Sequence, residues 1–168
     1  MKKIALFVAT LGIGTRMPFM GTVGSVLSLP VCWVAIEVSR QSGNIGWIVY
    51  LTITLLVLVA GIISVPVAEK MLGPRLDPHG KMREHDQNQI AIDETLGMLI
   101  TAAPLLFFEG NALFYALVLL LFRVFDIIKI WPTRIFDRME SAWGVMLDDA
   151  VAGIYAAICV FGAIKFLF

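Results

Sequence analysis

Long apolar runs separated by short polar stretches make up most of the chain. The clearest run, residues 45–66, carries no charge, and about 20 such residues in a helix cross the hydrocarbon of a bilayer. Runs at 111–122, continuing as a helix to 130, and at 150–168 are also long enough to cross. Shorter runs at 25–38 and 95–108 are bounded by charges and could cross if they are tilted or packed inside protein.

Residues 4–13 form an apolar run that is too short to span. We expect a re-entrant or interfacial helix there. The whole pattern therefore predicts an all-α, multi-pass helical membrane protein with about five spans plus this short N-terminal helix. At 168 residues, the chain is expected to form one membrane-embedded domain over 1–168.

Composition supports a membrane protein. The hydrophobic fraction is 59%, whereas soluble domains have about 45–50%. A soluble core of this size could not hide so much apolar surface, so lipid is expected to cover part of it. The 13 basic and 13 acidic residues cancel, and no overall positive field indicates a nucleic-acid partner.

Basic residues gather in two of the polar connections and at the start of the chain. They are Lys70, Arg75, Lys81 and Arg83 in one loop, Lys129, Arg134 and Arg138 in another, and Lys2, Lys3 and Arg16 at the start. Basic residues beside spans mark the cytoplasmic side. With both loops inside, five crossings alternate consistently, beginning inside near Gly24 and ending outside near Phe168.

Acidic residues form three clusters at the predicted cytoplasmic ends of spans. The first holds His85, Asp86, Asp93 and Glu94, the second holds Arg123, Asp126 and Lys129, and the third holds Asp148 and Asp149. A spacing of three residues places the members of the second cluster on one helix face. Ionisable groups at membrane depth are costly and usually face a wet cavity or the protein interior. The alternative is that these acids only cap helix starts, where the helix dipole favours negative charge.

Carboxylates from several helix ends, without repeated His or Cys, suit a hard cation such as Mg²⁺. The candidate ligands are Asp86, Asp93, Glu94, Asp126, Asp148 and Asp149. Mg²⁺ usually takes one or two carboxylates and keeps several waters, so some of these groups are expected to hold water or act as bases. Asp93 and Asp149 are the leading candidates to orient or deprotonate an attacking water, and an aspartyl-phosphate intermediate is equally allowed. Lys129 and Arg123 would offset developing negative charge.

A glycine-rich segment leads into the run at 25–38. Gly21, Thr22, Gly24 and Ser25 could let backbone amides and hydroxyls approach a phosphate at a helix start. Glycine and serine in a membrane protein also permit close helix packing, and this alternative stays open.

At these residues the chain resembles the bacterial phosphatidylglycerophosphatase A family. The resemblance covers nearly the whole chain and rests on motifs at 21–25, 85–86, 93–94, 123–132, 136–138, 144–149 and 152–153. It implies a multi-pass enzyme of the bacterial inner membrane that hydrolyses phosphatidylglycerol phosphate with Mg²⁺ at the cytoplasmic face. It also adds His85 to the catalytic candidates and Arg138 to the substrate-binding ones. Met20 and Ile130 stand where the family commonly has proline, which affects local backbone stiffness more than charge.

An ion or solute carrier is the alternative function, because carriers also place carboxylates among spans. That class predicts charges near the bilayer midplane and inverted repeats. Here the charges gather at one predicted face and no repeat is visible.

Overall fold

The computed structural model describes residues 1–12, 20–76, 82–83, 89–108 and 111–167. Its helices are α1 (Lys2–Thr10), α2 (Met20–Gln41), η1 (Gly43–Ile45), α3 (Gly46–Leu72), α4 (Ile92–Ala102), η2 (Ala103–Phe107), α5 (Ala112–Ile128), α6 (Thr133–Asp137) and α7 (Ala142–Leu167). Between α3 and α4, the two-residue strands β1 (Arg75–Leu76) and β2 (Met82–Arg83) pair antiparallel. The helical class is confirmed, with this short ladder as an addition.

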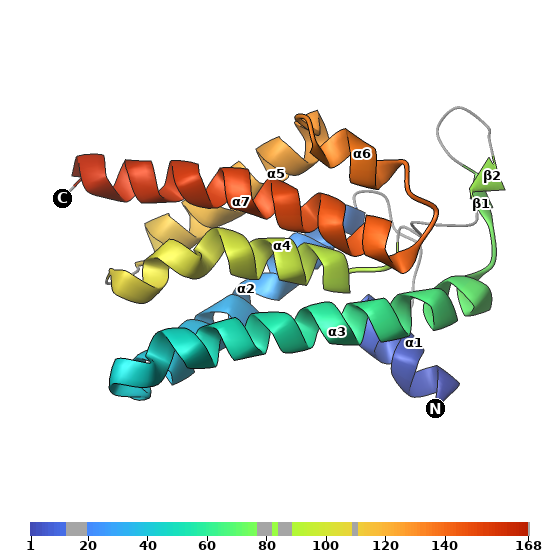
Figure 1. Ribbon diagram of the computed structural model, residues 1–168, viewed down its shortest axis with the longest axis horizontal. Helices are drawn as coiled ribbons and strands as arrows, with labels where there is room; N and C mark the ends of the chain where they lie inside the picture. The colour runs from blue at the N-terminus through green and yellow to red at the C-terminus, as the bar shows by residue number, and fades with distance from the viewer. Residues whose placement is uncertain (13–19, 77–81, 84–88, 109–110, 168) are drawn as a thin grey trace.

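The longer helices lie lengthwise in the molecule, and the chain reverses direction between them (Figure 1). The N-terminus lies near one end, and α7 starts near that end and runs to the C-terminus at the other. Helix α4 packs against α2, α3, α5 and α7, so it occupies the middle of the bundle.

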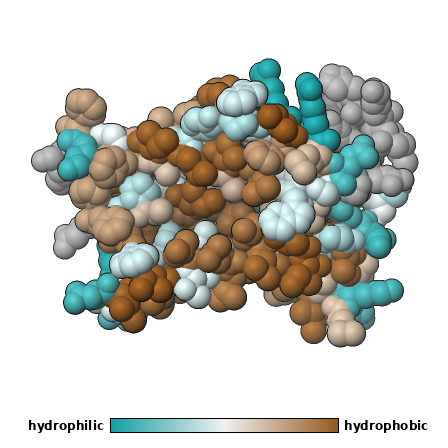
Figure 2. Space-filling view, in the orientation of Figure 1, coloured by the Kyte–Doolittle hydropathy of each residue, from teal (hydrophilic) through white to brown (hydrophobic). Residues whose placement is uncertain are grey.

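Three helical segments are long and apolar enough to cross a membrane, namely Gly21–Gln41, Gly43–Leu72 and Ala142–Phe166. Figure 2 shows hydrophobic side chains over the middle of one face, with most hydrophilic ones toward the right-hand end. On α3, the side chains of Leu51, Leu55, Leu56, Val59 and Ile63 are exposed. Such a surface is unfavourable in water and favourable in lipid, so the apolar helices fit a membrane protein.

Helix α4 is short, and protein surrounds it on all sides. Every residue from 92 to 99 is buried. Its Met98 and Leu99 join a core with Phe122 of α5 and Ala156 of α7. A helix enclosed by other helices does not need to match the bilayer thickness with its own length, so its 11 residues are sufficient.

Helix α7 begins earlier than the apolar pattern indicated. It starts at Ala142 instead of near 150, because Val145 and Met146 are buried against α3 and α4 residues such as Val65 and Leu96. The sequence had predicted that Asp148 and Asp149 precede the helix. They lie inside it instead. A pure capping role, which requires the first residues of a helix, does not apply to them.

Helix α3 likewise continues past Pro66, where the predicted span ended, to Leu72. The N-terminal helix α1 packs beside α3, and the Ala91 N–H donates to the Ala9 carbonyl at 2.9 Å. Phe7 on α1 is exposed. The expected short N-terminal helix is present, and whether it lies at the interface or is re-entrant stays a prediction.

Candidate metal and phosphate site

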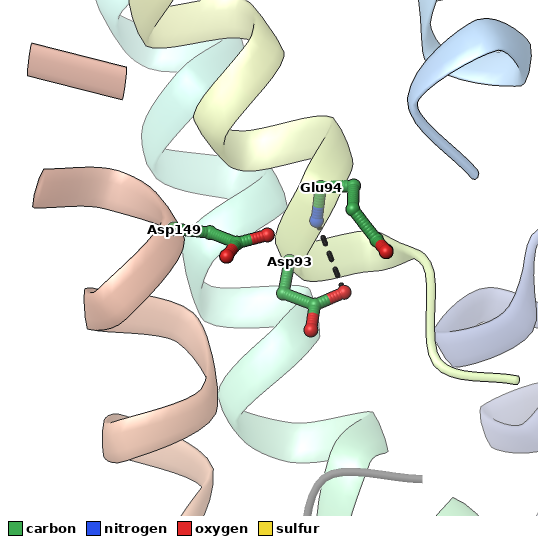
Figure 3. A group of neighbouring side chains, drawn as sticks. All are labelled: Asp93, Glu94 and Asp149. Atoms are coloured by element: carbon green, nitrogen blue, oxygen red, sulfur yellow. Dashed lines mark hydrogen bonds between the residues drawn. The ribbon is translucent and has the colours of Figure 1, made fainter. Parts of the chain in front are cut away.

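Three carboxylates from two helices meet inside the bundle, near the end where α4 and α7 begin. Asp93 and Glu94 come from the first turn of α4, and Asp149 comes from the second turn of α7 (Figure 3). One oxygen of each lies within 4.8 Å of one oxygen of the others, and the residues are only 7%, 8% and 5% exposed. Ionised carboxylates this close and this buried repel one another, so the group needs a cation or protons among them.

The contacts of these carboxylates fit a metal ligand set. The Glu94 N–H donates to Asp93 Oδ1 at 3.0 Å, whereas the buried Glu94 Oε2 has no hydrogen-bond partner in the part of the chain that the structure describes. A buried carboxylate oxygen without a partner is costly. The set offers only oxygen atoms, which hard divalent cations prefer, so these residues fit such an ion.

The start of α2 lies directly over Glu94. A Cβ atom added to Gly21 would lie 3.0 Å from both terminal nitrogens of Arg123 and 3.1 Å from Glu94 Oε1. One added to Gly24 would lie 3.1 Å from Glu94 Oε2. An added methyl group at either position would be tighter than an ordinary contact, so the glycines let the α2 backbone lie close to the Glu94 carboxylate.

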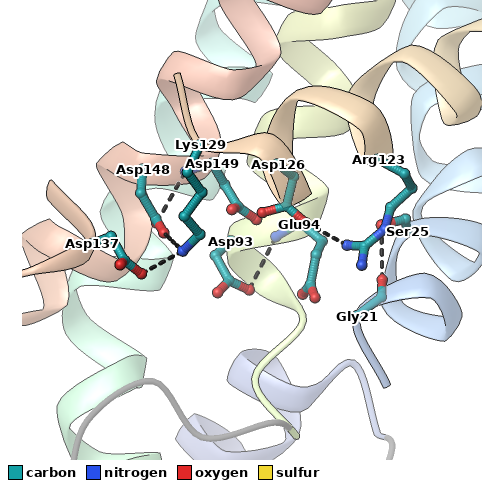
Figure 4. A network of polar contacts seen from close by, with 10 residues as sticks. All are labelled: Gly21, Ser25, Asp93, Glu94, Arg123, Asp126, Lys129, Asp137, Asp148 and Asp149. Carbon is teal, nitrogen blue, oxygen red and sulfur yellow. Dashed lines mark hydrogen bonds and ion pairs between the residues drawn. The ribbon is translucent and has the colours of Figure 1, made fainter. Parts of the chain in front are cut away.

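The two hydroxyls of this segment differ. Ser25 is fully buried, and its hydroxyl donates to the Gly21 carbonyl at 2.8 Å (Figure 4). Thr22 is exposed. The proton of Ser25 is therefore used inside α2, whereas the Thr22 hydroxyl is accessible to a ligand.

Arg123 and Asp126 of α5 form an ion pair at one side of the carboxylates (Figure 4). Arg123 Nη1 lies 2.6 Å from Asp126 Oδ2, and the two side chains are mostly buried. This contact confirms that the two residues share a helix face. Arg123 Nε is buried and makes no hydrogen bond to the residues that the structure describes.

Lys129 forms a second ionic group at the other side. It follows α5 in a left-handed conformation, with φ 48°, and its Nζ donates to Asp137 of α6 and to Asp148 of α7 (Figure 4). Burial lowers the pKa of Lys129, but the two carboxylates raise it by more, so the net pKa lies above its ordinary value. Lys129 is therefore a permanent cation at neutral pH. Asp148 Oδ1 also accepts the Asp149 N–H at 3.0 Å, which links this group to the three carboxylates.

The remaining predicted residues have separate positions. Arg138 is exposed at the end of α6, and no contact between described residues joins it to the carboxylates. His85 and Asp86 lie outside the described residues. Sequence reasoning missed Asp137 as a site residue, although its place between Phe136 and Arg138 in the family motif was a usable signal.

The fold and the site together describe an apolar helical bundle in which three buried carboxylates could hold a cation, beside two ion-paired basic residues, Arg123 and Lys129. The sequence model of the family described as phosphatidylglycerophosphatase A matches residues 6–164, so the chain belongs to this phosphatase family. The resemblance noted from the sequence is thereby confirmed.

Individual relatives agree with this assignment. The chain is 41% identical to phosphatidylglycerophosphatase A of Haemophilus influenzae over 81 residues, and the match spans 48% of each protein, about half of that relative. It is 29% identical to phosphatidylglycerophosphatase A of Escherichia coli over 147 residues, 87% of this chain and 74% of the relative. A Bacteroides thetaiotaomicron protein, provisionally named phosphatidylinositol-3-phosphatase, is 28% identical over 95% of both chains. No solved structure matches the chain.

Proposed function

We propose that this protein hydrolyses phosphatidylglycerol phosphate to phosphatidylglycerol and inorganic phosphate, with Mg²⁺ bound by Asp93, Glu94 and Asp149. The observation that carries the proposal is the buried carboxylate group with its unpartnered Glu94 oxygen. Family membership supports the phosphate monoester as substrate. The carrier alternative receives no support from the comparisons.

The chain's own residues supply most of the chemistry. Bound Mg²⁺ would polarise the phosphoryl oxygens. Arg123 and Lys129 attract the dianionic phosphate and offset charge that develops on its oxygens. Asp126 and Asp148, which the sequence also suggested as metal ligands, act mainly by fixing these two cations.

Hydrolysis requires a new P–O bond from water and cleavage of the bond between phosphorus and the glycerol oxygen. Asp93 or Asp149 accepts the proton of the attacking water and, directly or through a water molecule, returns it to the departing alkoxide. The same residues could instead attack phosphorus and form an aspartyl phosphate that water then hydrolyses. Thr22 and the amides at the start of α2 hold the headgroup, while the acyl chains stay in the bilayer.

We further propose five crossings, with α4 and α5 as the two that are shorter than the rest. Alternating helix directions support this count (Figure 1), and the enclosure of α4 explains its length. Basic residues at the site end, Lys70 and Lys129 among them, support a cytoplasmic active site in a bacterial inner membrane. In a cysteine-free background, Lys70→Cys should react with an impermeant reagent only from the cytoplasmic side. Labelling in intact cells would reverse this orientation.

Phosphate release by the purified protein in mixed micelles tests the activity. Phosphatidylglycerol phosphate, a phosphorylated inositol lipid and soluble glycerol phosphate would be compared with Mg²⁺ and with EDTA. We expect release from phosphatidylglycerol phosphate above the other two, loss with EDTA and recovery with Mg²⁺. Full release by metal-free protein would contradict the metal, and preference for the inositol lipid would contradict the headgroup.

A further inference from the structure

The crossing of α4 and α7 lies one helical turn from the carboxylates. Gly97 follows Asp93 by four residues, and Gly153 follows Asp149 by four. Residues four apart lie on nearly the same face of a helix, about 6 Å along its axis. Each glycine therefore lies on the same helix face as the carboxylate of its own helix, one turn further toward the C-terminal end of that helix.

At this crossing the two backbones touch. A Cβ atom added to Gly153 would lie 2.5 Å from the Gly97 carbonyl oxygen and 3.1 Å from its Cα. One added to Gly97 would lie 2.8 Å from the Asp149 carbonyl oxygen and 2.3 Å from Phe122 Cε2. These obstacles are mostly backbone atoms, which cannot rotate away as a flexible side chain can.

A hydroxyl one turn further along α4 bonds at the same crossing. Thr101 Oγ1 donates to the Gly97 carbonyl at 2.8 Å and lies 3.4 Å from the Gly153 carbonyl. Thr101 is fully buried, so its hydroxyl has no contact with water. The two helices are thus in direct contact from Gly97 to Thr101, with little freedom to adjust.

We propose that Gly97 and Gly153 are positioning residues, which set the separation of α4 and α7 so that Asp149 can share a cation with Asp93 and Glu94. The inference rests on the proposed metal-dependent function. Asp93 and Glu94 are neighbours on one helix, whereas Asp149 comes from another, so only its place in the ligand set depends on that separation. A methyl group at Gly153 would move the α7 backbone away from α4 and carry Asp149 with it.

The variant Gly153→Ala tests this role, and Gly162→Ala is its matched control. Gly162 lies on the same helix, and an added Cβ there would meet no atom within 4 Å. A second control is Gly61→Ala on α3, where the added Cβ would meet the Met146 side chain of α7 at 2.3 Å. It perturbs the packing of α7 without lying between the two helices that carry carboxylates.

Mn²⁺ affinity would be measured by titration calorimetry on the full-length protein in detergent, together with the Mg²⁺ dependence of turnover. We expect Gly153→Ala to weaken Mn²⁺ binding at least ~10-fold, as loss of support around metal ligands commonly does. The Mg²⁺ concentration for half-maximal turnover should rise by a similar factor, with activity recovering at saturating Mg²⁺. Gly162→Ala and Gly61→Ala should keep wild-type affinity.

The outcomes separate this inference from the proposed function. No Mn²⁺ binding by the wild type would overturn the metal site itself. Wild-type binding with unchanged affinity in folded Gly153→Ala would overturn only the positioning role. Should Gly153→Ala fail to fold, Thr101→Val serves, since it adds no bulk and removes the hydroxyl at the crossing. It should weaken Mn²⁺ binding about two- to fivefold, and wild-type affinity in that variant would overturn the inference.

Discussion

The two ends of the bundle both bring charged side chains close to helix termini, but they satisfy those charges differently. At the end away from the site, Arg40 in the last turn of α2 donates to the carbonyls of Leu105 and Phe108, where η2 ends. Its Nη1 also lies 3.4 Å from Glu37 Oε1. The cation there is matched by groups that a helix terminus leaves open.

At the site end, three carboxylates instead crowd together beside the ion pairs of Arg123 and Lys129. Asp93, Glu94 and Asp149 approach one another, and Glu94 Oε2 finds no hydrogen-bond partner among the described residues. The bonds of Arg40 stabilise the fold, whereas a buried carboxylate oxygen without a partner among the described residues is suited to a ligand. Substitutions at the two ends should therefore change different quantities.

The largest effect is expected for Asp149→Asn, which keeps side-chain size and removes one charge from the cation site. Turnover should fall at least ~10²-fold, because both metal binding and proton transfer depend on this carboxylate. The melting temperature in EDTA should stay or rise, since like-charge repulsion is relieved. Asp93→Asn should behave alike, and the double variant should lose far less than the product of the two effects. Wild-type phosphate release by either variant would remove that residue from the site.

A smaller loss of turnover is expected for Lys129→Met, which removes the cation that Asp137 and Asp148 share. Turnover should drop about tenfold, and the free energy of unfolding should decrease by about 2 kcal/mol for the lost charged hydrogen bonds. Asp137→Asn, measured beside it, should keep the cation and lose less turnover. Equal losses in both variants would mean that the ion group matters only as a whole. Denaturant unfolding and initial rates would report both quantities.

Arg40→Gln is expected to leave turnover unchanged while it destabilises the protein. The variant loses hydrogen bonds to two carbonyls, which should lower the free energy of unfolding by about 1–3 kcal/mol. A fall in turnover at a temperature where the variant is fully folded would contradict the division between the two ends.

The smallest effect belongs to Glu37→Gln, which removes only a partly exposed ion pair at that end. The free energy of unfolding should change by less than about 1 kcal/mol, and turnover should not change. A loss as large as that of Arg40→Gln would show that Glu37, and not the carbonyls, satisfies Arg40.

Sequence patterns predicted the all-helical class and the apolar helices, but not every helix boundary. The three-residue spacing predicted that Arg123 and Asp126 share a face, and the 2.6 Å contact confirms it. The predicted start of α7 was wrong, because residues 142–147 form no long apolar run. Burial of Val145 and Met146 keeps these residues in the helix.

The sequence could not predict which of the carboxylates lie together and which pair with basic residues. It depends on which helices cross: α4 and α7 meet at two glycines and bring Asp149 to Asp93. Lys129 bonds to Asp148, and its second partner, Asp137, comes from α6, which folds back beside α7. Local spacing carries no information about such crossings. The roles of His85 and Asp86 stay predictions.

The most direct test is to locate the cation. Crystals of the full-length protein grown with Mn²⁺ would be measured at the manganese absorption edge, and the anomalous difference map would be compared for wild type and Glu94→Gln. The wild type should show a peak bounded by the carboxylates of Asp93, Glu94 and Asp149, weaker or missing in the variant. A peak of equal height in both, or one beside Asp137 and Asp148 instead, would contradict the account.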